Sequence, residues 1–196
     1  MKTELNTDIS VALRAIENRK IGNVFLVACG GSLSVMHPGK YFLDRHSKAL
    51  NSDVYNGDEF VARSPRRLDE NALVILCSQT GTTKETVRAA EFARSRGAAT
   101  IAMTITYAMM LIGTLDSSSP LASAAEHIVN YQASYTTGVP IDAEDSNYGV
   151  LYMLLAGLIK QIEGVDIIAS LLSSLNHLQP AIDKAHIGLK PLFDEY

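Results

Sequence analysis

The sequence is poor in cysteine and has no excess of basic residues, and each absence excludes a class of protein. Its 196 residues include two cysteines, Cys29 and Cys77, which lie far apart and form no CxxC or Cys/His cluster. They fit reduced thiols better than a disulfide or zinc framework. Lys and Arg number 17 against 21 Asp and Glu, so nucleic acid has little support as a partner. The polar N-terminus, MKTELNTDIS, carries no apolar signal segment, and we expect a cytoplasmic protein.

One long stretch without charge raises the question of a membrane. Residues 98–115 contain no charged side chain and are about as long as a membrane span. Threonines, a tyrosine and a glycine dilute the hydrophobicity of this stretch, and no basic cluster flanks it closely. We therefore expect no membrane helix but a buried parallel strand over residues 99–104, followed by an apolar loop or helical turn. A strand covered on both faces reads as a continuous apolar run.

Strands and helices are predicted to alternate along the chain. Short apolar runs rich in β-branched residues predict strands at 23–28, 53–55, 73–77, 99–104 and 127–131. Helical spacing predicts helices at 7–20, 34–49, 82–96 and 148–162, the first capped by Asn6 or Thr7 and the last by Asp145 or Ser146. Residues 166–187 have apolar side chains at helical spacing, and Pro180 is expected to break them into two helices.

This alternation predicts an α/β fold. Strands that follow one another through helices form right-handed crossovers, so we expect a three-layer α/β/α sandwich with a mostly parallel five-stranded sheet. The length predicts one domain over residues 1–196, with a core at about 20–165 and a C-terminal helical segment at 166–196. In such folds ligands bind beyond the carboxyl ends of the strands.

Two glycine- or hydroxyl-rich turns follow predicted strands. CGGS begins at Cys29 and SQTGTT at Ser78. A strand-to-helix turn presents unpaired backbone N–H groups at the positive end of a helix dipole, which suits a phosphate. Ser78, Gln79, Thr80 and Thr83 can donate hydrogen bonds, and Gly81 lets the backbone approach closely. Alternatively, Thr80 or Thr82 is an ordinary N-cap and the other hydroxyls only solvate a loop.

Together the two turns resemble the SIS, or sugar isomerase, domain, which is also found in the isomerase half of glucosamine-6-phosphate synthase. The sequence is most similar to the N-terminal half of fructosamine-6-phosphate (fructoselysine-6-phosphate) deglycases, through VFLVACGGS, LVILCSQTGTTKETVRAAEFARSRGAATIAMT and NYGVLY. The resemblance implies a flavodoxin-like topology and a phosphorylated sugar or amino sugar as ligand. It implies that Ser32, Ser78, Gln79, Thr80 and Thr83 hold the phosphate, while Gly30, Gly31 and Gly81 keep the pocket open.

The resemblance has two limits. Family deglycases carry two SIS domains, and no match is found here to their second-half motifs, GEF followed by HGPFE. Cleavage of a fructosamine needs a positioned general base, so the catalytic residues are unknown and the chain is expected to bind better than it catalyses. The alternative function is a non-catalytic phosphosugar-sensing or oligomerisation subunit. In addition, residues 105–117 are an extra apolar stretch that could form a lid, an oligomer contact or an insertion.

The remaining candidates are weaker. Glu85, Asn147 and Tyr148 are placed at the rim of the pocket, although Glu85 also suits the first turn of a helix. The five histidines are scattered without metal-ligand spacing, so we expect no metal and no cofactor. The apolar helices predicted after residue 147 leave faces for a homodimer, or for assembly with a second SIS domain.

Overall fold

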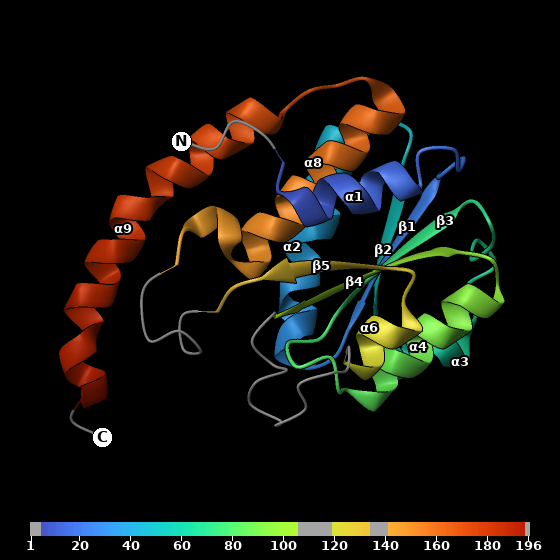
Figure 1. Ribbon diagram of the computed structural model, residues 1–196, viewed down its shortest axis with the longest axis horizontal. Coiled ribbons are helices and arrows are strands. Elements are labelled where there is room, and N and C mark those ends of the chain that lie inside the picture. The colour runs from blue at the N-terminus through green and yellow to red at the C-terminus, as the bar shows by residue number, and fades with distance from the viewer. Residues whose placement is uncertain (1–4, 106–118, 134–140, 195–196) are drawn as a thin grey trace.

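The computed structural model of the protein describes residues 5–105, 119–133 and 141–194, with the side chains of His186 and of residues 190–194 left out. Figure 1 shows helices on both sides of one twisted sheet. Along the chain the elements are α1 (Thr7–Ala15), β1 (Asn23–Ala28), α2 (Gly31–His46), β2 (Asn51–Asn56), α3 (Gly57–Arg63), β3 (Ala72–Cys77), α4 (Lys84–Ser95), β4 (Ala99–Ile105), α6 (Pro120–Ala124), β5 (His127–Tyr131), η1 (Ala143–Asp145), α8 (Asn147–Glu163) and α9 (Ile168–Asp194).

The sheet has the strand order β2-β1-β3-β4-β5, and all four neighbouring pairs are parallel. This is the order of the flavodoxin-like fold, so the predicted fold class is confirmed. All six residues of β3 and all seven of β4 are buried, which explains the apolar sequence of β3 and the uncharged, mostly apolar sequence of β4. The predicted strand at 53–55 extends over Asn51–Asn56 at the edge of the sheet.

The strand side chains alternate between two separate cores, one on each face of the sheet. On the first face Leu26 and Ile75 belong to a core shared with α1, α2, α8 and the start of α9. On the other face Phe25 and Val74 pack with α3, α4 and α6. Figure 1 shows these two helical layers. Because the pleat sends successive side chains to opposite faces, a continuous apolar strand supplies both cores.

Several helix boundaries differ from the prediction. Helix α1 ends at Ala15 rather than near Lys20, because the next residues turn and the Arg19 guanidinium reaches Gly97 O at 3.0 Å. Helix α2 begins at Gly31 and ends at His46, three residues earlier at each end than predicted. The short helices α3 and α6 were not predicted; their N-caps are Asn56 and Ser119.

The predicted break at Pro180 is wrong. Helix α9 runs without interruption from Ile168 to Asp194 and contains Pro180. Proline removes one backbone hydrogen bond from a helix, but its fixed φ is compatible with helical geometry. Pro180 is exposed, so the carbonyl that it leaves without a helical partner lies near solvent. The neighbouring Gln179 side chain meanwhile holds the helix to the domain by accepting a hydrogen bond from Ala143 N at 2.7 Å.

The structure also bears on the uncharged stretch at 98–115. Its first part is the buried strand β4, as predicted, while residues 106–118, most of the proposed extra stretch, lie outside the described residues. Among the residues that the structure describes, no helix has the length and apolar character needed to cross a bilayer.

Candidate phosphate-binding site

The register of the sheet brings the two predicted turns to the same edge. Strands β1 and β3 are neighbours, and Ala28 at the end of β1 pairs with Cys77 at the end of β3. From there the chain enters α2 on one face and α4 on the other. Strands whose connections leave in opposite directions define a topological switch point, where ligands of doubly wound folds bind.

The first turn is open and has no side-chain cap. Gly30 is the N-cap of α2 at φ +55°, and neither Gly30 nor Gly31 has an atom within 4 Å of the position of an added Cβ. The half-buried Ser32 side chain lies beside the Cys77 thiol at the end of β3. Burial raises the pKa of this thiol to about 11, an effect that the nearby Ser32 and Tyr131 side chains only partly offset.

The second turn is organised by two pairs of hydroxyl groups. Ser78 Oγ lies 2.9 Å from Thr83 Oγ1, and Thr80 Oγ1 lies 2.7 Å from Thr82 Oγ1. Thr83, not Thr80 or Thr82, is the N-cap of α4, and its side chain caps no backbone N–H. The ordinary N-cap interpretation of Thr80 or Thr82 is therefore wrong, and the first turn of α4 keeps backbone donors without a side-chain cap.

Exposure differs among the predicted phosphate-binding residues. Ser78 is only 2% exposed, Gln79 and Thr83 are half-buried, and Thr80 is exposed. A ligand at this turn would therefore meet Thr80 at the surface and Ser78 at the floor. The side chains that form the two turns carry no formal charge, so an anion here depends on N–H and O–H donors and on two helix dipoles.

Strand β4 and helix α6 hold the second turn from the side. Gln79 O accepts hydrogen bonds from Ile105 N at 3.1 Å and Thr104 Oγ1 at 3.0 Å, and Gly81 O accepts one from Leu121 N at 2.9 Å. Sequence reasoning missed Thr104 as a supporting residue. The available signal was its position at the carboxyl end of a predicted parallel strand.

Gly81 is required where the second turn meets α6. Its φ is +67°, and an added Cβ would lie 2.0 Å from Ser119 Oγ. Ser119 was also missed by sequence reasoning, although a serine before proline is a helix-start signature; its Oγ accepts a hydrogen bond from Ala122 N at 3.3 Å.

The start of α3, directly after β2, adjoins the same edge. Gly57 packs so closely on the first turn of α4 that an added Cβ would lie 2.8 Å from the backbone carbon of Glu85. This contact places the Glu85 backbone beside the first residue of α3. By contrast, none of the hydrogen bonds described for Asn147 or Tyr148 reaches either turn; Asn147 Oδ1 accepts one from Tyr148 N at 2.8 Å.

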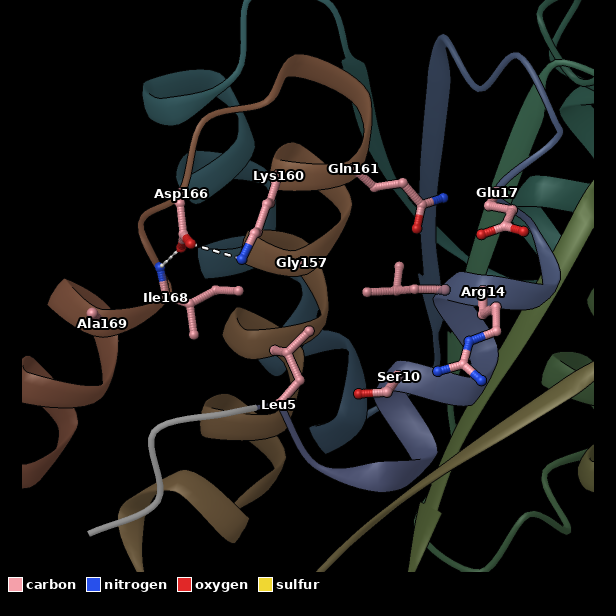
Figure 2. Close-up of a pocket in the computed structure, with 11 residues that line it drawn as sticks. Leu5, Ser10, Arg14, Glu17, Gly157, Lys160, Gln161, Asp166, Ile168 and Ala169 are labelled. Carbon is pink, nitrogen blue, oxygen red and sulfur yellow. Dashed lines mark hydrogen bonds and ion pairs between the residues drawn. The ribbon is translucent and has the colours of Figure 1, made fainter.

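The largest described hollow lies elsewhere. It measures about 650 Å³ between α1, α8 and the start of α9, and Figure 2 shows Ser10, Arg14 and Lys160 at its walls. None of the predicted phosphate-binding side chains lines it. No group of three or more His, Cys, Asp or Glu side chains suited to a metal ion occurs within the described part of the chain.

The family is decided by a comparison of the whole domain. The SIS domain model matches residues 17–156, which include both turns and all five strands. The chain belongs to the SIS domain family. Fructosamine deglycase FrlB of Bacillus subtilis (strain 168) is 41% identical to it over 182 residues, which cover 93% of this chain and 51% of that protein.

Two further relatives agree with this assignment. Fructoselysine 6-phosphate deglycase of Escherichia coli (strain K12) is 34% identical over 132 residues, 66% of this SIS chain and 36% of that protein. A solved structure from Bacillus subtilis, named as a candidate phosphosugar isomerase, has a TM-score of 0.82 and 39% identity, and the match covers 94% of this chain and 52% of that one. The chain thus spans about half the length, or less, of the proteins that it matches.

Proposed function

We propose that this SIS domain binds a phosphorylated sugar or amino sugar, with its phosphate held between the turns after β1 and β3. The observation that carries the proposal is that the register of β1 and β3 brings these turns to one edge at the switch point, where the Ser78 and Thr83 hydroxyls pair. Two helices begin there without side-chain caps, so their free N–H groups suit a phosphate dianion.

Within this proposal the predicted residues have distinct roles. The hydroxyls of Ser32, Ser78, Thr80 and Thr83 and the Gln79 side chain would replace water around the phosphate, because each supplies a donor without filling the pocket. Gly30, Gly31 and Gly81 would let the backbone approach the ligand. The backbone contact at Glu85 supports its place near the rim, whereas Asn147 and Tyr148 have no described contact that supports theirs.

The test is calorimetric titration of the 196-residue chain with fructose 6-phosphate and glucosamine 6-phosphate, with unphosphorylated fructose as the ligand control. A double variant, Ser78→Ala with Thr83→Ala, removes the hydroxyl pair. Hydrogen bonds to a charged group contribute about 1.5–3 kcal/mol each, so we expect affinity to fall at least about tenfold.

Ser95→Ala is the matched control variant. It removes a hydroxyl from the other end of α4, where Ser95 Oγ donates to Phe92 O at 2.7 Å, and its affinity should equal that of the parent. Affinity unchanged by the double variant, or equal binding of fructose and fructose 6-phosphate, would contradict the assigned site.

We propose further that the domain belongs to an enzyme of the fructosamine-6-phosphate deglycase or aldose–ketose isomerase type. Its similarity to FrlB over 93% of the chain supports this. Because the chain has no match to the family's second-half acid/base motif, the general base would come from another domain or polypeptide. The alternative remains a sensing or oligomerisation subunit. Turnover of fructoselysine 6-phosphate by this chain alone would refute the missing-base argument.

The bounds of the domain, its location in the cell and its assembly are part of the same proposal. A single domain over residues 1–196 is supported by the single sheet, because the core on each of its faces packs the strands against the helices of that face. A cytoplasmic location is supported by Cys29 and Cys77, which form no disulfide. Assembly as a homodimer, or with a second SIS domain, is supported by exposed apolar side chains on α9.

A further inference from the structure

The hollow of about 650 Å³ between α1, α8 and the start of α9 has the size of a small-molecule site. Helix α1 meets α8 at Gly157, where an added Cβ would lie 2.5 Å from Leu13 Cδ1 and 3.0 Å from Leu5 Cδ1. Because glycine has no side chain, α1 packs directly against the backbone of α8 at this point. The start of α9 contributes Ile168 and Ala169, so three helices enclose the hollow (Figure 2).

The floor of the hollow is apolar. Leu13 and Ile168 line it and are 5% and 7% exposed, because both belong to the core on this face of the sheet. Leu5 also lines it and packs, half-buried, against the same core. An apolar group placed on these side chains would leave water for an apolar surface, which favours binding.

The walls of the hollow carry four charged side chains, of which two already form a pair. Lys160 Nζ lies 2.7 Å from Asp166 Oδ2, and Asp166 Oδ1 accepts a hydrogen bond from Ile168 N at 3.0 Å. The other two, Arg14 and Glu17, line the hollow from α1. Neither side chain has an ion pair or hydrogen bond with any residue that the structure describes. One unpaired positive and one unpaired negative side chain therefore stand together above the apolar floor.

We propose that this hollow binds a free α-amino acid with an apolar side chain. The Arg14 guanidinium would donate two hydrogen bonds to the ligand carboxylate, and the Glu17 carboxylate would accept one from the ligand ammonium group. Residues three apart on a helix have their Cβ atoms about 5–6 Å apart, so both can reach groups carried by one carbon atom. The ligand side chain would lie on Leu13 and Ile168. Figure 2 shows Gln161 reaching from α8 toward the same wall, where its amide can add a hydrogen bond.

The lining argues against other classes of ligand. Its two cations and two carboxylates balance, so a phosphate dianion attracted by Arg14 would be repelled by Glu17. No aromatic side chain is found among the described lining residues, so a nucleobase would have nothing on which to stack. Ser10 and Gln161 are the uncharged polar side chains described there, too few to satisfy the hydroxyls of a sugar. A zwitterion with an apolar part fits all of these features.

Titration of the 196-residue chain with L-leucine, followed by nitrogen-15 NMR spectroscopy, tests the site. A ligand of about ten non-hydrogen atoms should bind with a dissociation constant of about 1 mM, so concentrations from about 0.1 to about 50 mM span the transition. Three control ligands each lack one part of leucine. The ammonium group is missing from 4-methylpentanoate, the carboxylate from 3-methylbutylamine, and the apolar side chain from glycine. Each should bind at least about fivefold more weakly than leucine.

Two variants assign the charged groups of the ligand to their partners. Arg14→Gln should weaken leucine and 4-methylpentanoate about fivefold or more but leave 3-methylbutylamine unaffected, because that ligand has no carboxylate to lose a partner. Glu17→Gln should weaken leucine and 3-methylbutylamine by a similar factor but not 4-methylpentanoate. Arg45→Gln is the matched control. Arg45 is likewise an exposed arginine in the last turn of a helix, α2, but it does not line the hollow, so leucine binding should be unchanged.

The outcomes separate the parts of the proposal. Absence of leucine-dependent shifts in the amide signals of α1 and α8 overturns it, as does leucine binding that both variants leave unchanged. Equal binding of leucine and glycine refutes the role of the apolar floor, and loss of 3-methylbutylamine binding in Arg14→Gln refutes the orientation. Circular dichroism verifies that the variants are folded. The proposed phosphate site is tested separately, because a phosphosugar should shift the signals of the turns at Ser32 and Ser78 instead.

Discussion

Replacing Gly81 by alanine tests how tightly the second turn is held against α6. Gly81 combines φ +67° with a neighbour that an added Cβ would meet at 2.0 Å, Ser119 Oγ, and at 2.5 Å, Ser119 Cβ. Gly164 provides a matched control at the C-cap of α8. Its φ is +70°, but nothing lies within 4 Å of its added Cβ. The two substitutions therefore share the backbone strain and differ in the steric clash.

The expected magnitudes follow from that difference. A left-handed conformation costs a residue other than glycine about 1–2 kcal/mol, and this alone applies to Gly164→Ala. Overpacking adds about 1–3 kcal/mol, so Gly81→Ala should lower the free energy of unfolding by about 3 kcal/mol. For a domain of this size about 1 kcal/mol shifts Tm by about 2–4 °C. We expect Tm to fall by about 3 °C for Gly164→Ala and by about 9 °C for Gly81→Ala.

Urea denaturation followed by circular dichroism measures both free energies, since the chain has no tryptophan for fluorescence. Ser119→Gly removes the clashing atoms, so a double-mutant cycle with Gly81→Ala should show a favourable coupling of about 2 kcal/mol. Equal destabilisation by Gly81→Ala and Gly164→Ala, or a coupling near zero, would refute the steric argument.

Two further predictions concern Glu163 and Cys77. The Ser47 hydroxyl and the backbone N–H groups of Lys48 and Ala49 hold the pKa of Glu163 below its ordinary value of 4.5. A lowered pKa stabilises the fold above the unfolded pKa and loses that effect as pH falls through the folded pKa. Glu163→Ala should therefore cost about 1 kcal/mol near pH 7 in urea denaturation, and the deficit should shrink in acid; a constant deficit would contradict this. A thiol reagent near neutral pH should label the partly exposed Cys29 in the folded chain and Cys77 only after unfolding, because Cys77 is buried and its pKa is about 11. Equal labelling rates in the folded chain would show that Cys77 is accessible.

The strands were the most predictable part of the fold. Residues 73–77 are a continuous apolar run and residues 99–104 an uncharged, mostly apolar one, and both are buried strands in the centre of the sheet. Their sequence is sufficient because a strand covered on both faces must be mostly apolar and free of charge. Helices α3 and α6 escaped prediction because seven and five residues are too few for a periodic pattern. The break predicted at Pro180 does not occur because the backbone hydrogen bond lost at the proline is outweighed by contacts such as the one between Gln179 and Ala143.

The candidate site was predictable in its place but not in its contacts. Two turns that follow parallel strands must lie at the same edge of a sheet, so sequence reasoning could bring Ser32 and Ser78 to one edge. It could not tell that Thr83 rather than Thr82 is the N-cap of α4, because helix starts shift by one or two residues with local hydrogen bonds. The support from Thr104 and Ser119 depends on the β4 register and on the packing of α6, which adjacent residues do not encode.

Taken alone, the sequence determined the α/β class, the strand segments and the chemistry of the two turns, because the spacing of apolar residues and the donors in each turn are local properties. Only the tertiary structure decided that β1 lies beside β3, that their connections leave toward opposite faces, and that the apolar side chains of α9 are buried near its start and exposed farther along. These depend on which distant segments bury one another's apolar surface, and that is settled by the free energy of the whole packed core.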